Sequence, residues 1–180
     1  MDILVLSDSH GRRDRLPAVL RQLNFRPGAI LFLGDGLRDL QALEEDPFGA
    51  EIPCYAVCGN CDGFFGMTDG TPDERLLTLG GKKIMLLHGH RWQVRLGPEA
   101  AALHAVKAGA DVLLFGHTHV PYEATWQAGE CLPGGSVLSK PLLIANPGSI
   151  GEPRDGGPPR FGVLTIRGEQ VAFSLGKWQP

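Results

Sequence analysis

The sequence has no apolar run that approaches the ~20 residues needed to cross a bilayer, and it lacks clusters of lysine and arginine. Its N-terminus has neither the basic start nor the apolar length of a signal peptide. Proteins that coat DNA or RNA depend on clustered positive charge, whereas the formal net charge here is -3. We therefore expect a cytoplasmic protein with no membrane partner and no broad nucleic-acid binding.

Cysteine is also scarce. The chain has four cysteines in 180 residues, and in the cytoplasm we expect them to be reduced. Internal repeats and long linkers are absent, so residues 1–180 are expected to form a single domain. Apolar residues make up 43% and charged residues 21%, which is typical of a globular enzyme.

The apolar pattern predicts the fold class. Continuous apolar runs, typical of strands buried on both faces, lie at 3–6, 29–33, 55–58, 84–87 and 112–115. Helical spacing occurs at 16–23, 37–43 and 98–108, with Pro98 expected in the first helical position. A hairpin is expected at 75–79 and 82–87, and strand-like pieces follow near 121–126, 141–145, 161–166 and 170–175. These elements predict an α/β (α+β) fold, a two-sheet β-sandwich flanked by helices.

Metal-ligand residue types follow each of the five buried runs, in chain order: Asp8 and His10; Asp35; Asn60; His88 and His90; His117 and His119. Five of the six histidines fall at these positions. Ligand sites of α/β sheets lie beyond the carboxyl ends of the strands. We therefore expect these side chains to meet at one edge of the fold.

Imidazole, carboxylate and amide groups together suit Mn, Fe, Zn or Ni better than a soft thiolate site would. The set is too large for one tetrahedral ion, whereas two ions bridged by a carboxylate would accommodate it. Such a pair lowers the pKa of a bridging water, and the resulting hydroxide can attack phosphorus in line. The residues therefore indicate a two-metal hydrolase of phosphate esters.

The sequence resembles the calcineurin-like metallophosphoesterases over nearly its whole length. The motifs that match are Asp8-Ser9-His10, Gly34-Asp35, Gly59-Asn60-Cys61-Asp62, His88-Gly89-His90 and Gly116-His117-Thr118-His119. The cysteine of the third motif, the chain length and Asn146-Pro147-Gly148-Ser149 are similar to the small YfcE-type phosphodiesterases.

This resemblance implies a role for each ligand. It assigns Asp8, His10 and His119 to the first metal. It assigns Asn60, His88 and His117 to the second, with Asp35 bridging the two. It also implies manganese as the usual ion, with iron, zinc, nickel or magnesium as substitutes, and a small phosphodiester as substrate.

Further predictions concern residues beside the ligands. Many relatives have a histidine, thought to protonate the leaving group, where this chain has Cys61. A thiol is a weaker acid than imidazolium at neutral pH, which favours diesters with activated or cyclic leaving groups. His90 is a candidate for supporting a metal ligand or contacting phosphate. Asp62 is a candidate for orienting a neighbouring ligand or Cys61, or for capping a turn. Asn60, and one of Arg12 and Arg13, are candidate substrate contacts, since guanidinium pairs well with phosphate.

Several alternatives stay open at this point. The chain could also be a phosphomonoesterase or a nuclease. It could instead be a protein-binding scaffold, like the eukaryotic retromer subunit that shares the fold implied by the resemblance. Cys58 and Cys61 have Cys-x-x-Cys spacing, which also occurs in redox and zinc sites. Substrate specificity is expected in the loops at 62–73 and 151–159. The oligomeric state is open, a homo-oligomer included.

Overall fold

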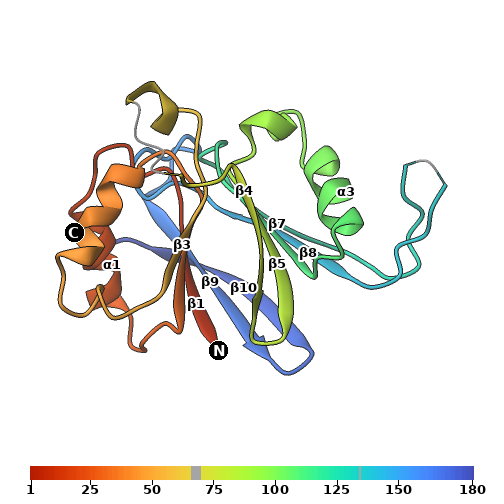
Figure 1. Cartoon of the computed structure of the whole chain (residues 1–180), viewed down its shortest axis with the longest axis horizontal. Coiled ribbons are helices and arrows are strands. Elements are labelled where there is room, and N and C mark those ends of the chain that lie inside the picture. Colours follow the sequence, from red (N-terminus) through yellow and green to blue (C-terminus); the bar gives the residue numbers. More distant parts are fainter. Residues whose placement is uncertain (66–69, 134) are drawn as a thin grey trace.

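The computed structural model describes residues 1–65, 70–133 and 135–180 of the chain. It contains two five-stranded sheets packed face to face, with helices on the outer faces (Figure 1). The first sheet has the order β10-β9-β1-β2-β3 and the second β4-β5-β6-β8-β7. The expected β-sandwich is therefore confirmed. Of the segment 62–73, where specificity was expected, residues 66–69 lie outside the described residues.

The strands of the first sheet are β1 (Asp2–Leu6), β2 (Ala29–Phe32), β3 (Cys54–Ala56), β9 (Arg160–Arg167) and β10 (Gln170–Lys177). Those of the second are β4 (Glu74–Leu79), β5 (Lys82–Leu87), β6 (Val112–Phe115), β7 (Pro121–Trp126) and β8 (Leu142–Pro147). The α-helices are α1 (Arg15–Gln22), α2 (Gln41–Glu44) and α3 (Glu99–Lys107), and the 3-10 turns are η1 (Leu37–Leu40), η2 (Asp62–Phe65) and η3 (His90–Trp92). None of the described helices combines the length and apolarity that a membrane span requires.

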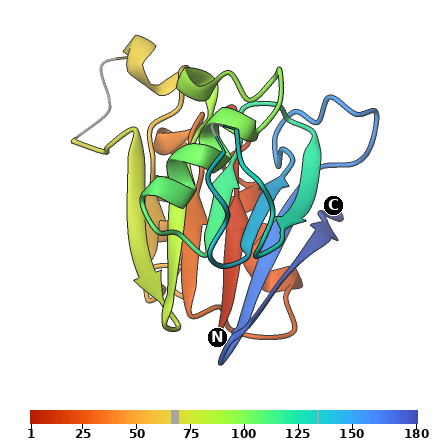
Figure 2. The same cartoon turned by 90° about the vertical axis from the view of Figure 1, so that its right-hand side faces the viewer.

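The central strands run parallel, and they form the core because both of their faces are apolar. In β1, Ile3 and Val5 point between the sheets, whereas Leu4 and Leu6 pack with α1. This alternation follows from the two-residue period of a strand. The strands of the second sheet show the same alternation, and the outer face of this sheet packs against small residues of α3: Ala101, Ala102 and Ala105. Figure 2 shows α3 lying across that face.

Three local expectations need correction. The strand expected at 55–58 spans Cys54–Ala56 and is an edge strand with Cys54 exposed, because only β2 pairs with it. The helix expected at 37–43 is a 3-10 turn followed by the single turn of α2. Pro98 precedes the first residue of α3 and does not occupy it.

Replacing Leu31 with alanine should lower the free energy of unfolding by about 2–5 kcal/mol, the usual cost of a cavity in a close-packed core. Leu31 lies on β2 between the sheets and is fully buried. Urea denaturation followed by circular dichroism measures the change. Leu175→Ala is the matched control, since Leu175 on β10 is 44% exposed, and it should cost about 0.5 kcal/mol or less. Equal losses in the two variants would contradict this packing.

Candidate metal centre

The seven candidate ligands lie at one edge of the sandwich, where parallel strands of both sheets end. The loops after β1, β2 and β3 bring residues from the first sheet, and those after β5 and β6 bring residues from the second. In Figure 1 this edge is at the top, opposite the N-terminus. The convergence expected from the sequence is therefore present.

Five of these ligands have left-handed backbone conformations. The φ angles of Asp8, His10, Asp35, His117 and His119 lie between 45° and 66°. Among the other described non-glycine residues, Gln93 alone has a positive φ. Each such residue costs roughly 1–3 kcal/mol and persists only where the surrounding structure imposes it. The backbone of these loops therefore adopts an unfavourable conformation that directs the candidate ligand side chains toward the site.

Glycine allows the loops after β2 and β3 to approach closely. A Cβ atom added to Gly59 would lie 2.1 Å from the Asp35 carboxylate, and one added to Gly34 would lie 2.6 Å from the Gly59 nitrogen. Such distances are far below van der Waals contact. Only glycine at these positions lets the Asp35 and Asn60 loops meet.

A first cluster consists of Asp8, His10 and His119. The Asp8 side chain is fully buried, and its Oδ1 atom has no hydrogen-bond partner among the described residues. This oxygen lies 3.2 Å from His119 Nε2 and 3.8 Å from His10 Nε2. His119 Nδ1 donates to the Glu152 backbone carbonyl at 2.6 Å, which leaves the Nε2 lone pair facing Asp8. A cation would compensate these opposed acceptors, so the donor set fits a divalent metal.

A second cluster consists of Asp8, Asp35 and His88. His88 Nδ1 donates to the Leu33 carbonyl at 2.7 Å, and its Nε2 faces Asp35 Oδ2 at 3.4 Å and Asn60 Oδ1 at 3.1 Å. Burial alone would lower the pKa of His88, but the Asp35 and Asp8 carboxylates outweigh this effect and raise the pKa above its usual value. Burial alone would likewise raise the pKa of Asp35, but His88 and the Cys61 amide hold it well below its usual range. These shifts indicate a site built for a positive charge.

His117 belongs to neither cluster, although its ring centroid lies 5.1 Å from that of His88. Its backbone nitrogen donates to Asp8 Oδ2 at 3.1 Å. Burial and the neighbouring His88 lower the pKa of His117 to about 4. Its imidazole is therefore neutral at physiological pH, as a metal ligand must be.

Asp62 connects the loops that carry the ligands. Its Oδ2 atom accepts hydrogen bonds from the backbone nitrogens of Asp35 and Gly59, each at 2.8 Å. Its Oδ1 atom accepts from Gly36 and Leu37 at 2.8 and 2.9 Å. Asp62 thus orients Asp35 relative to the Asn60 loop, which agrees with the orienting role expected for it.

Cys61 and His90 both lie beside the clusters. The Cys61 sulfur is within 4.8 Å of ligand atoms of His10 and Asp35, and it accepts a hydrogen bond from Asn60 Nδ2 at 3.2 Å. Burial, and then the Asp35 carboxylate, raise the pKa of Cys61 to about 12, so it is a protonated thiol. The His90 ring lies 5.4 Å from that of His88, and burial lowers the pKa of His90. Its buried Nδ1 has no hydrogen-bond partner among the described residues.

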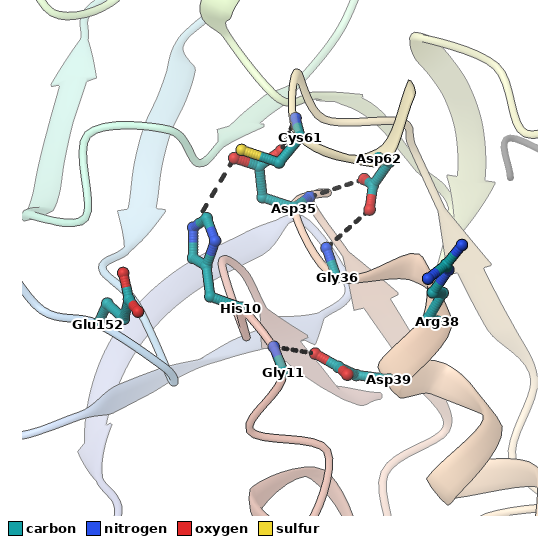
Figure 3. Close-up of a pocket in the computed structure, with 9 residues that line it drawn as sticks. All are labelled: His10, Gly11, Asp35, Gly36, Arg38, Asp39, Cys61, Asp62 and Glu152. Atoms are coloured by element: carbon teal, nitrogen blue, oxygen red, sulfur yellow. Dashed lines mark hydrogen bonds and ion pairs between the residues drawn. The ribbon is translucent and has the colours of Figure 1, made fainter. Parts of the chain in front are cut away.

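The arginines differ from expectation. Arg13 forms an exposed ion pair with Glu45 at 2.6 Å, and neither Arg12 nor Arg13 lines the cavity beside the clusters. Arg38 lines it instead (Figure 3). The sequence offered no signal that distinguishes Arg38 from the other two, apart from its place three residues after Asp35.

Two more supporting groups come from the segment Asn146 to Ser149. Asn146 Nδ2 donates to the Gly116 carbonyl at 2.8 Å, and Ser149 Oγ donates to the Asp8 carbonyl at 2.7 Å. Both side chains are buried. This segment therefore lies beside the site, and its two hydrogen bonds fix the backbone at Asp8 and at Gly116.

The comparisons with known proteins agree with this geometry. A family model described as the calcineurin-like phosphoesterase superfamily domain matches residues 1–169. The phosphodiesterase YfcE of Escherichia coli is 32% identical over 186 residues, which cover 91% of this chain and 87% of YfcE.

Solved structures show the same architecture. A conserved Streptococcus pneumoniae protein, described as a predicted phosphoesterase, has a TM-score of 0.72 at 26% identity, covering 98% of this chain and 88% of that protein. Vps29 of Entamoeba histolytica, solved with Zn²⁺, has a TM-score of 0.65 at 23% identity, covering 99% and 100%. The second likeness concerns the fold alone.

Replacing Asp62 with asparagine should weaken metal binding by about 10- to 100-fold, as loss of a group that orients ligands typically does. The new amide NH₂ would face backbone N–H donors that now meet a carboxylate. Isothermal titration with Mn²⁺ measures the affinity. Asp73→Asn is the control, because Asp73 forms an ion pair with Arg91, and its affinity should equal that of the wild type. Unchanged affinity in Asp62→Asn would show that the four hydrogen bonds do not position the ligands.

Proposed function

Since the chain belongs to the calcineurin-like phosphoesterase superfamily, we propose that it is a phosphodiesterase that uses two divalent ions, with manganese preferred. The observation that carries this proposal is the buried Asp8 oxygen, which has no hydrogen-bond partner among the described residues and faces histidine nitrogens. We further propose a small phosphodiester as the substrate and the cytoplasm as the place of action.

Two ions are supported by the way the clusters overlap. One cluster holds Asp8 with His10 and His119, and the other holds Asp8 with Asp35 and His88. Asp35 also lies within 4.8 Å of His10 in a third grouping, which suits a bridging carboxylate. Bound divalent ions would supply a water of lowered pKa and neutralise charge on the phosphoryl oxygens.

The chain's own residues would orient the ester and supply the proton. The Asn60 amide contacts His88 Nε2 through its oxygen and the Cys61 sulfur through its nitrogen. It could therefore contact both a metal ion and the bound ester. Cys61 stays protonated and is a poor donor at neutral pH. A site with such a weak acid favours esters whose leaving group needs little protonation, which is the support for diesters. The name of YfcE, a phosphodiesterase, agrees with this preference.

A protein-binding scaffold is the second candidate, because Vps29 proteins are among the structural neighbours. One of them was solved with Zn²⁺, so metal content alone does not separate the two functions. Catalytic turnover does separate them.

Removing metal with a chelator should abolish hydrolysis of bis(p-nitrophenyl) phosphate, and adding Mn²⁺ should restore it, because the ions supply the nucleophile. Asp8→Ala and His117→Ala should each lower kcat by more than about 100-fold, the scale on which loss of one charge-stabilising group acts. His104→Gln is the control, since His104 pairs with Glu74 outside the clusters, and it should keep wild-type activity. Metal-independent hydrolysis would contradict the proposal, and no hydrolysis of any phosphodiester would favour the scaffold.

Replacing Cys61 with histidine should raise the hydrolysis of phenyl monoesters relative to bis(p-nitrophenyl) phosphate by on the order of ten-fold. Imidazolium is better matched to neutral pH as a proton donor, and the poorer leaving group depends more on protonation. Rates for both substrates, in the wild type and the variant, give the ratio. A wild-type protein that already hydrolyses monoesters faster than diesters would contradict the role given to Cys61.

A further inference from the structure

A third grouping of possible metal ligands contains His10, Asp35 and Cys61, whose ligand atoms all lie within 4.8 Å of one another. His10 and Asp35 already belong to the proposed metal centre, whereas Cys61 has no role in it as a ligand. The Cys61 sulfur lies beside the Asp35 carboxylate, and the His10 ring points toward both (Figure 3). Zn²⁺ binds sulfur at about 2.3 Å and imidazole nitrogen at about 2.0 Å, so small side-chain rotations would bring all three groups to one ion.

The loop that carries Cys61 fixes the sulfur in this position. The Cys61 N–H donates to Asp35 Oδ1 at 2.7 Å, and the Gly59 N–H donates to Asp62 Oδ2 at 2.8 Å. The same Asp62 oxygen accepts the Asp35 N–H, so the two loops are tied together on both sides of Asn60. Because the groups are held in place before an ion arrives, little conformational freedom is lost when they bind it.

The charges around the thiol favour a cation. The carboxylates of Asp35, Asp62 and Asp8 all act on Cys61 electrostatically. The buried Asp8 Oδ1 has no hydrogen-bond partner among the described residues. It lies 3.8 Å from His10 Nε2, which is equally far from Asp35 Oδ2. A divalent ion beside His10 would neutralise these carboxylates, and the same ion would then allow a thiolate next to them.

The sulfur has the chemistry of a ligand for thiophilic ions. Asn60 Nδ2 donates to it at 3.2 Å, a hydrogen bond that suits a thiolate as well as a thiol. Thiolates favour ions such as Zn²⁺, whereas carboxylate and water suit Mn²⁺. On coordination the thiol proton would leave to solvent, and an electron pair of the sulfur would form the bond to the ion. Ions and solvent can reach the sulfur through a cavity of about 360 Å³, which His10, Asp35 and Cys61 all line.

We propose that Cys61 is a conditional metal ligand, which binds thiophilic divalent ions such as Zn²⁺ together with His10 and Asp35 and remains a thiol beside Mn²⁺. The same position therefore holds the two kinds of ion in different ways. Coordination of Cys61 would also remove the proton that it supplies to the leaving group. The proposal rests on the metal centre of the proposed function and is independent of which ester is cleaved.

The test measures ion affinity and absorption and does not depend on turnover. In isothermal titration of the metal-free protein, Cys61→Ser should bind Zn²⁺ at least about ten-fold more weakly than the wild type, since loss of a group that only supports a ligand already costs about 10- to 100-fold. The Mn²⁺ affinity should be the same in both proteins, because manganese gains little from sulfur. Bound to the wild type, Cd²⁺ and Co²⁺ should each give the ultraviolet charge-transfer band of a metal thiolate, and Cys61→Ser should lack this band.

Two other cysteines provide the controls. Cys131 is an exposed free thiol, and the Cys58 sulfur is buried against the Gly59 carbonyl. Neither belongs to a grouping of possible ligands found among the described residues. Cys131→Ser and Cys58→Ala should therefore keep the wild-type Zn²⁺ affinity and the charge-transfer band. A band that disappears in either control would assign the thiolate to another cysteine and overturn the proposal.

The remaining outcomes separate this proposal from the metal centre itself. A wild type that binds Cd²⁺ without a thiolate band would overturn the role of Cys61 and leave the metal centre intact, and this result depends on no variant. Equal Zn²⁺ affinities in the wild type and Cys61→Ser would overturn it as well. A wild type that binds neither Mn²⁺ nor Zn²⁺ would instead refute the metal centre, and with it the proposed function.

Discussion

The Asp8 carboxylate is buried in the middle of the site, and the surrounding structure depends on how its charge is compensated. One oxygen accepts hydrogen bonds from Ser7 Oγ and the His117 nitrogen, and the other has no described hydrogen-bond partner. Burying such a charge without compensation is strongly unfavourable. The Nδ1 atoms of His119 and His88 donate to backbone carbonyls, so their Nε2 atoms can compensate this charge only by binding a proton, which the raised pKa of His88 reflects. A bound cation would compensate the Asp8 charge and would accept the lone pairs of His119 Nε2 and His88 Nε2.

The sandwich supplies the rigidity that holds these opposed groups together. The ligand loops begin at the ends of β1 and β2 in one sheet and of β5 and β6 in the other, so the packing between the sheets sets their separation. Ser149 and Asn146 then fasten the loops by bonding to the carbonyls of Asp8 and Gly116. The left-handed backbone at five ligands is held against its own strain by this frame.

The edge at which the ligands meet was predictable from the sequence, because each ligand follows an apolar run and parallel strands end on the same side. The two-sheet class was predictable for a similar reason, since the helical period disappears in the last third. Edge strand β3 was not, because Cys54–Ala56 is as apolar as a central strand and only the sheet order exposes it. The contacts of Asp62 and the place of Arg38 were not predictable either. They depend on backbone N–H groups and loops that approach only in the folded chain.

The likeness to Vps29 concerns the fold alone, and a fold does not specify a function, so the argument for catalysis has to come from the side chains. A surface that only binds another protein has no physical need for buried carboxylates that face histidine nitrogens. Nor does it need five ligands in a conformation that destabilises the fold. Backbone strain of this kind can be offset by a bound ligand, because a ligand that binds only the native state stabilises that state. The arrangement around Asp8 therefore supports the metal-dependent catalysis proposed for this chain.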